Sequence, residues 1–233
     1  MNLTEITIPG SCTTLQKYAF KGCTSLVSIT IDNGIASIGE SAFAYCDNLA
    51  NVTIPDSVTS VGNSAFEGCK IAKATIPALA VSAIPQNDLK EVVITSGTIG
   101  ISAFSYCSSL TSVTIGNNVT SIDNEAFRFC TSLTSVTIGN GVTSIGTYAF
   151  HNCSSLTSVT IGSGVTRIGE LAFWKIGNEA TIILLGTEPP MISSDTFYSD
   201  YLEKIIVPKG CKEKYIERTN WANLAEKIQE AVE

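Results

Sequence analysis

The sequence predicts a solenoid in which short parallel β-strands stack on one another, one strand to each coil. The first indication is a fixed period: the dipeptide AF recurs with steps of 23, 23, 38, 23, 23 and 23 residues between Phe20, Phe43, Phe66, Phe104, Phe127, Phe150 and Phe173. The second is a Cys three residues after Phe in six of these copies, and the third is an apolar-x-x-apolar-x-apolar pattern with the same period. Such a period indicates a repeat architecture, because each unit buries its apolar side only against its neighbours.

Each coil begins with its strand, for example LTSVTIG at residues 110–116 and again at 133–139. The segment alternates and is rich in β-branched residues, which favours a short strand. The dipeptides NN, NG and SG that follow are expected to turn the chain, because Asn and Gly tolerate positive φ. The AFxxC segment is too short for a long helix, so we expect a helical turn or an irregular loop there. With weaker copies at both ends, the chain holds about ten coils.

The middle of the chain departs from the period. Ile71 and Leu89 are 18 residues apart, Leu89 and Leu110 are 21 apart, and the stretch PALAVSAIPQNDLKE at 77–91 lacks both AF and Cys. We therefore expect irregular, shortened coils over about residues 70–109. The solenoid as a whole is expected to cover 1–211 and to form a single domain with the segment that follows.

The last segment, residues 212–233, is expected to be a helical cap. In NWANLAEKIQEAVE the apolar residues fall at helical spacing, and Asn220 or Thr219 can cap the helix start. Terminal repeats need such a cover because they would otherwise expose the end of the core. The apolar residues are Trp221, Leu224, Ala225, Ile228 and Val232.

The eight cysteines are expected to be free thiols in the core. Equivalent cysteines of adjacent coils would have parallel Cβ vectors about 5 Å apart, whereas a disulfide needs Cβ atoms about 3.8 Å apart. There is no C-x-x-C, and the single histidine, His151, cannot complete a zinc site with them. Cys12 and Cys211 fall nine residues after the leading Leu, a slot that apolar residues fill in other coils. Buried free Cys behaves as a small apolar group.

The composition excludes several function classes. Only 15% of residues are charged and the net charge is −7, which argues against a nucleic-acid binder. Ser, Thr, Asn and Gly interrupt every apolar run, so no membrane-spanning helix is expected. No catalytic motif occurs, and His151 occupies a slot held elsewhere by Ala44, Glu67, Ser105 and Arg128, which suggests a solvent-facing position. We expect no catalytic residues, no metal and no cofactor.

The strands offer a candidate binding face. In L-x-x-V-x-I the apolar residues point inward, so the residues between them form two outward columns that are uncharged and hydroxyl-rich in the centre. Thr also suits a half-exposed strand for purely structural reasons, and that alternative stays open. The candidate ligand-binding residues are Ser28, Thr30, Asn51, Thr53, Ser112, Thr114, Ser135, Thr137, Ser158 and Thr160.

The pattern L-x-x-V-x-I-G/P-x-x-V-x-x-I-G-x-x-A-F-x-x-C closely resembles the BspA-like leucine-rich repeat over essentially the whole chain. The resemblance implies a curved right-handed leucine-rich-repeat solenoid, with its short parallel sheet on the concave face. It also implies a secreted or surface-anchored microbial protein that binds host or matrix partners, and no catalytic residues. The segment VPKGCKEKYIERTNW at 207–221 resembles the closing segment of such arrays.

We therefore expect a monomeric, non-catalytic binding or adhesion module that recognises a protein or glycan on its strand face. A structural spacer that displays another domain is the alternative, and binding to a crystal surface such as ice is a remote third. Met1 is followed by NLTEITIP, which has neither the basic start nor the apolar run of a signal peptide. Because that opening lies partway into a repeat, we expect the chain to be a trimmed piece of a longer protein.

Overall fold

The computed structural model describes residues 3–232. Met1 and Glu233, where the expected solenoid begins and the expected cap ends, lie outside the described residues. The chain, for which the sequence predicts one domain, groups by its internal contacts into two compact units, Met1–Ser96 and Gly97–Glu233. These are called unit 1 and unit 2, and each is described by itself.

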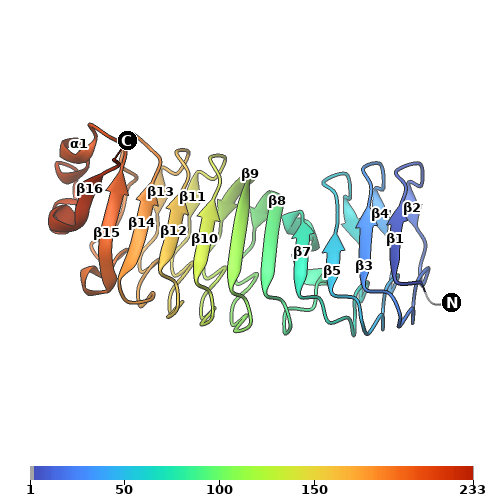
Figure 1. Cartoon of the computed structure of the whole chain (residues 1–233). Coiled ribbons are helices and arrows are strands. Elements are labelled where there is room, and N and C mark those ends of the chain that lie inside the picture. Colours follow the sequence, from blue (N-terminus) through green and yellow to red (C-terminus); the bar gives the residue numbers. More distant parts are fainter. Residues whose placement is uncertain (1–2, 233) are drawn as a thin grey trace. The chain divides into compact units, whose positions relative to one another are not determined.

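Both units are parallel-strand solenoids, so the predicted fold class is confirmed, with about ten turns over the chain (Figure 1). In unit 1 the strands pair in the order β1 (Glu5–Ile8), β3 (Ser28–Ile31), β5 (Asn51–Thr53), β7 (Lys73–Ile76) and β8 (Glu91–Ile99), the last of which continues into unit 2. A second parallel sheet on the same coils contains β2 (Thr14–Leu15), β4 (Ser37–Ile38) and β6 (Ser60–Val61).

Unit 2 repeats the arrangement. Its main sheet runs through β9 (Ser112–Ile122), β10 (Ser135–Ile138), β12 (Ser158–Ile161), β14 (Ala180–Leu184), β15 (Leu202–Val207) and β16 (Ile228–Glu230). A shorter ladder joins the end of β9 to β11 (Ser144–Ile145), and β11 to β13 (Arg167–Ile168). In both sheets, equivalent residues of successive coils pair, for example Val113 with Val136 and Val136 with Val159.

The core of each unit is a set of side-chain files along the stack. In unit 2 the rings of Phe104, Phe127, Phe150, Phe173 and Phe197 stack with centroids 5.0–5.3 Å apart and planes within 7° of parallel. Phe20, Phe43 and Phe66 form the corresponding file in unit 1. One coil cannot enclose its Phe alone, so the burial of these rings stabilises the stack and not the single coil.

Positive φ occurs mainly in the AFxxC turns, not in the NN, NG and SG turns for which the sequence suggested it. The residue two after Phe is left-handed in every full coil, with φ from 52° to 75°, although it is Gly in only two of them. Among the Asn and Gly residues of the other turns, Gly34 has φ 114°, whereas Gly141 and Gly164 are not left-handed. The AFxxC turn holds bulky residues in this conformation because their N–H groups bond to the next coil, as Phe129 N–H does to the His151 carbonyl at 2.9 Å. The residues of this slot are Gly22, Tyr45, Gly68, Tyr106, Phe129, Asn152 and Lys175.

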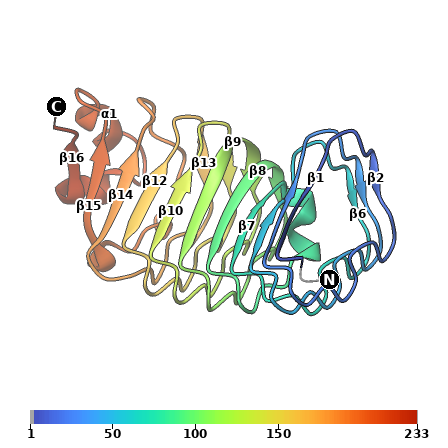
Figure 2. The same cartoon turned by 45° about the vertical axis from the view of Figure 1, so that its right-hand side comes forward.

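The coil between β7 and β8 is shortened, since Lys73 pairs directly with Glu91. The 3-10 helix η1 (Ala78–Ala83) replaces its AFxxC turn and buries Ala80 and Val81 (Figure 2). The side chain of Asp56 accepts hydrogen bonds from the hydroxyls of Thr95 and Ser96, at 2.5 and 2.7 Å. This contact ties the end of unit 1 to a turn two coils earlier.

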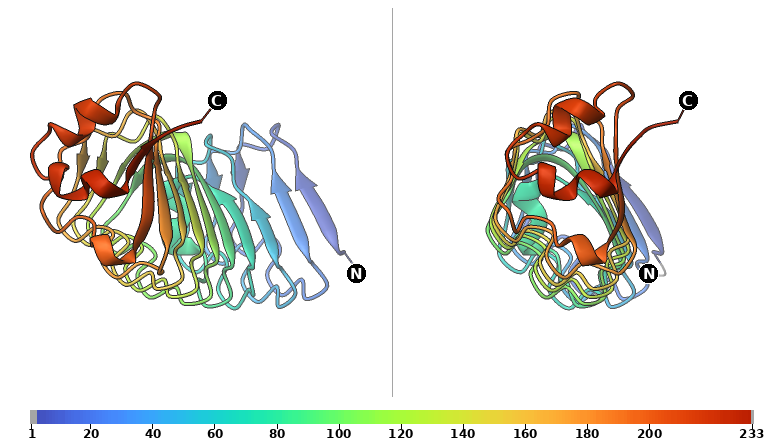
Figure 3. Two further views of the ribbon diagram at one scale, coloured as in Figure 1. Left: turned by 60° about the vertical axis from the view of Figure 1, so that its left-hand side comes forward. Right: turned by 90° about the vertical axis from the view of Figure 1, so that its left-hand side faces the viewer.

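The C-terminal cap differs from the expected helix. It consists of the α-helix α1 (Lys212–Ile216), the 3-10 helix η3 (Ala222–Lys227) and then strand β16, while the 3-10 helix η2 (Ser199–Tyr201) precedes β15. Ile228, predicted to be helical, instead pairs with Ile205 in the parallel sheet. Trp221 is fully buried, and its indole N–H donates to the Pro190 carbonyl at 2.8 Å. Figure 3 shows α1 and η3 lying across the end of the coils of unit 2.

All eight cysteines are free, as predicted, but not all of them are in the core. Cys46, Cys69, Cys107, Cys130 and Cys153 are buried, and the Cys130 thiol donates to the Phe104 carbonyl at 3.1 Å. Cys12 is exposed and Cys23 and Cys211 are partly exposed. The prediction of a core position was wrong for Cys12, Cys23 and Cys211; Cys12 lies in the first described coil, so a described coil packs on one side of it only.

We predict that a thiol reagent labels Cys12 rapidly in the native protein and the five buried cysteines only after unfolding. The thiolate is the reactive form, and burial raises the pKa of Cys107 to about 12. Timed alkylation with mass-spectrometric site assignment measures this. Cys12→Ser should remove the fast phase; fast labelling of Cys130 in folded protein would contradict the burial.

Candidate functional site

The strand face is made by the outward side chains of the first strand of each coil. In unit 1 it brings together four of the predicted site residues, since Ser28 pairs with Asn51 and Thr30 with Thr53. Lys73 and Thr75 continue the two columns on β7. None of the four predicted residues is buried. The period-2 geometry of the strand leaves their hydroxyl and amide groups facing solvent while Ile29 and Val52 pack inward.

In unit 2 the strand face brings together the other six predicted residues. The segment SVTI begins β9 and makes up the whole of β10 and β12. Ser135 pairs with Ser112 on one side and Ser158 on the other. Thr137 pairs in the same way with Thr114 and Thr160. All six side chains are exposed or partly exposed, and the inward Val113, Val136 and Val159 are buried. The result is a surface with two parallel rows of hydroxyl-bearing residues.

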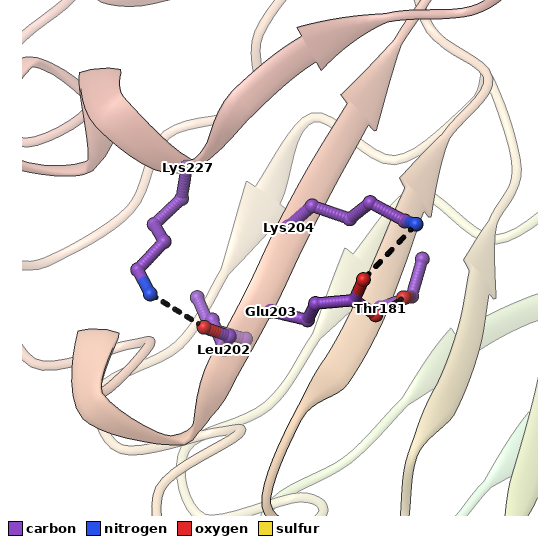
Figure 4. Close-up of polar contacts among 5 residues, drawn as sticks. All are labelled: Thr181, Leu202, Glu203, Lys204 and Lys227. Carbon is purple, nitrogen blue, oxygen red and sulfur yellow. Dashed lines mark hydrogen bonds and ion pairs between the residues drawn. The ribbon is translucent and has the colours of Figure 1, made fainter.

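Charged residues stand at the ends of the strand face within each unit. In unit 1, Lys73 and Glu91 form an ion pair at 2.9 Å beside a hollow of about 250 Å³ that Asn51, Thr53 and Thr75 also line. In unit 2, the Thr181 hydroxyl donates to Glu203 at 3.3 Å, and Lys204 pairs with the same carboxylate at 3.3 Å (Figure 4). These exposed pairs add little stability but mark the limits of the uncharged surface.

The chemistry of this face is hydrogen bonding without charge. Each hydroxyl can both donate and accept, and neighbouring rows repeat at the strand spacing of about 4.8 Å. The face has no Tyr, Trp or Arg on the three SVTI strands, and those are the residues that usually anchor tight protein interfaces. It can therefore hold a ligand through many weak, regularly spaced contacts.

His151 is buried beneath partly exposed aromatic side chains on the turn side of unit 2, which corrects the prediction that it faces solvent. Only 8% of the residue is exposed, and its ring stacks on Trp174 with centroids 5.1 Å apart. The rings of Phe129 and Tyr148 meet it edge-on at 5.9 and 5.2 Å. Comparing equivalent positions of the coils did not predict this burial, because the rings that cover His151 come from three different coils. The signal in the sequence that could have indicated the burial of His151 was the number of aromatic residues in the AFxxC turns between residues 106 and 174.

Burial lowers the pKa of His151 below its ordinary value of 6.5, and the nearby charges of Arg128 and Lys175 lower it further, while Glu125 acts in the opposite sense. His151 Nδ1 is buried without a hydrogen-bond partner among the described residues. The lowered pKa favours the neutral imidazole.

We predict that acidification destabilises unit 2 through His151. The unfolded state binds the proton more readily than the folded state, so this stability is complete above pH 6.5 and is lost as the pH falls towards the lower folded pKa. Thermal unfolding followed across pH 5–8 measures it. His151→Phe keeps the ring and should remove this part of the pH dependence; an unchanged profile would show that His151 does not cause it.

The described residues include neither a metal-binding cluster nor a membrane-spanning helix. Within residues 3–232, no group of three or more His, Cys, Asp or Glu side chains is arranged to hold a metal ion. No described helix has the length and apolar character needed to cross a membrane.

Comparison with known proteins agrees with the repeat pattern. The sequence model of the family described as "BspA type Leucine rich repeat region" matches the chain with six copies of the repeat region, over residues 1–92 and 97–223. None of the curated proteins matches the chain. A solved leucine-rich repeat protein from Bacteroides ovatus ATCC 8483 is 25% identical with a TM-score of 0.58, over 99% of this chain and 54% of that protein. The chain thus spans about half of that relative's length.

Two further solved structures share the repeat with lower structural similarity. The leucine-rich repeat protein of T. pallidum is 25% identical, over 75% of this chain and 77% of that chain, with a TM-score of 0.42. A leucine-rich cell surface protein from Faecalibacterium prausnitzii A2-165 is 22% identical, over 99% and 80%, with a TM-score of 0.35. Because the family model covers nearly the whole chain and the coils stack in its period, the protein belongs to the BspA-type leucine-rich repeat family.

Proposed function

We propose that the protein is a non-catalytic binding or adhesion module that recognises a protein or glycan on its strand face. The observation that carries the proposal is the uncharged double row of hydroxyls on β9, β10 and β12. Members of this family are typically interaction modules, and strand faces of solenoids are extended binding surfaces. The partner is a host or matrix protein or a glycan, held by repeated weak contacts.

The family also supports a place on the cell surface or outside the cell. The fold does not depend on disulfides. None of the eight cysteines is joined to another, and five of them pack in the core as small apolar groups. The alternative is a spacer that displays another domain and binds nothing itself. Specific micromolar binding by residues 1–233 alone would exclude the spacer.

The test is the triple variant Thr114→Glu, Thr137→Glu and Thr160→Glu. Three stacked carboxylates would occupy the hydroxyl row and repel one another at the strand spacing, so capture on arrays of glycans and matrix proteins should fall at least tenfold, or about 1.4 kcal/mol. Array signals for wild type and variant at equal concentration measure the effect.

The matched control places the same three charges six residues before each strand-face Thr, in the turns at Ser108, Thr131 and Ser154. These residues follow the Cys of each turn and are exposed. The control should bind as the wild type does, and circular dichroism should show that both triple variants are folded. Capture that survives the strand-face substitutions would discard this face as the binding site.

A further inference from the structure

Unit 2 has a second polar surface, which is a groove beside the short ladder of β11 and β13. Two adjacent hollows of about 390 and 420 Å³ share Thr147, Arg167 and Gly169 in their linings. The first also contacts Asp123, Asn124 and Ser144, and the second Glu170, Met191 and Ser193. The groove therefore runs along the stack over several coils.

The coil period creates this groove. Gly146 and Gly169 follow the last Ile of their coils, where a Cβ would lie 2.5 Å from the backbone of the preceding coil. The chain therefore has no side chain at Gly146 and Gly169, and the neighbouring side chains form the walls of the groove. Arg167 stands next to Ser144 in one ladder and next to Met191 in a parallel bridge.

The lining contains both hydrogen-bond donors and acceptors. Arg167 donates only, Asp123 and Glu170 accept only, and the Ser and Thr hydroxyls do both. Within the described residues, no ion pair engages Arg167, Asp123 or Glu170, so these groups are free to bind a ligand. The Asn124 side chain is fixed in the wall, since its Oδ1 accepts the Thr147 N–H at 2.9 Å.

Neutral polyhydroxyl ligands fit such a lining best. Each sugar hydroxyl donates and accepts, and so can satisfy a carboxylate on one side and a guanidinium on the other. An acidic or basic peptide would meet both signs of charge in the same groove. Nor can a peptide extend the ladder here, because β11 pairs on both sides and β13 lies between β11 and the Met191 bridge.

We propose that this groove binds a linear neutral oligosaccharide, with about one sugar ring to each coil step of about 4.8 Å. Exposed Ile101 and Met191, at 69% and 54%, offer apolar contacts for sugar C–H groups. The groove lies on the second ladder of each coil, so the site is separate from the strand face and does not depend on the proposed function.

The experiment is an NMR titration of isotope-labelled protein with neutral hexasaccharides: β-1,4-glucan, β-1,3-glucan, xylan and chitin oligomers. At least one should shift the amide signals of Asn124, Thr147 and Gly169. Arg167→Ala and Thr147→Val should each weaken that binding about tenfold or more, because each removes a hydrogen-bonding group from the shared part of the groove.

Four controls separate this site from others and test the role of Arg167. Arg218→Ala removes an exposed cation of unit 2 outside the groove and should leave saccharide binding unchanged. The strand-face triple glutamate variant should also leave it unchanged. Thermal unfolding checks that Arg167→Ala is folded, and Arg167→Gln, which keeps a donor, should lose less binding than Arg167→Ala.

Two results would overturn the proposal. One is that no hexasaccharide shifts the groove signals at millimolar concentration, or that the shifts lie on the strand face. The other is that a charged peptide shifts the groove signals while every saccharide leaves them unmoved, which would assign the groove to a peptide.

Discussion

Gly141→Ala is expected to destabilise unit 2 by about 3 kcal/mol or more, because the added methyl group cannot be accommodated. A Cβ at this position would lie 1.8 Å from the Asn117 carbonyl oxygen and 3.1 Å from that of Val119. Both atoms belong to the backbone of the preceding coil, which cannot turn aside as a side chain can. The coil would have to move away, and the adjacent hydrogen bond from the Asn140 N–H to Asn117 Oδ1, at 2.8 Å, would be strained as well.

Urea unfolding followed by circular dichroism measures this effect. Gly100→Ala is the matched control, because a Cβ there meets nothing within 4 Å and its φ is not left-handed. The control should change the free energy of unfolding by only a few tenths of a kcal/mol. Equal midpoints for the two variants would show that the coil spacing is not fixed by backbone contact.

Phe127→Ala is expected to cost about 3–5 kcal/mol, since it removes a fully buried ring from the middle of the file. The ring touches Phe104 on one side and Phe150 on the other, at 5.1 and 5.0 Å. Its loss leaves a cavity that flanking coils cannot close, because their backbones are tied to each other by hydrogen bonds such as Phe104 N–H to the Ala126 carbonyl at 2.7 Å.

Tyr106→Ala is the comparison for this prediction, since it also removes an aromatic ring from an AFxxC turn. Tyr106 is 66% exposed and contacts Phe129 on one face, so its loss should cost well under half as much. Both variants are compared by urea unfolding at one pH. A Phe127→Ala variant as stable as Tyr106→Ala would mean that the Phe file does not hold the coils together.

The fold could be predicted from the sequence because one period governs everything that packs inside. Residues 23 apart occupy equivalent positions, so Phe104, Phe127 and Phe150 had to meet if the coils stacked at all. The same logic placed the hydroxyl rows on one outward face. The sequence could not show whether those rows bind anything, because Thr is also favoured there for structural reasons.

The end of the C-terminal cap was predicted wrongly because the helical spacing of its apolar residues competed with the 23-residue period. Residues 221–232 have helical spacing, but Ile228 also lies 23 residues after Ile205, and the period prevailed. Pairing with β15 satisfies the backbone groups of β16 and buries Ile228, which an isolated helix of this length could not match. The repeat distance was the better guide even in the last coil.

The surroundings of His151 and Arg167 could not be predicted from the 23-residue period, because they depend on residues that differ between equivalent positions of the coils. His151 is buried by Trp174, which stands in the same slot of the next coil, where the five coils before His151 have non-aromatic residues. The groove at Arg167 depends on Met191 in place of a short polar residue. Variation between coils, and not the repeat itself, distinguishes these surfaces.

The backbone ladders described above also determine how unit 2 yields to mechanical tension. Each coil is tied by hydrogen bonds only to the coil before and the coil after it, in the strands and in the turns alike. A pulling force on the chain end therefore peels one coil at a time, and each rupture frees 23 residues, or about 80 Å of extended chain. No disulfide joins its cysteines, so we expect the chain to lengthen in equal steps as successive coils separate.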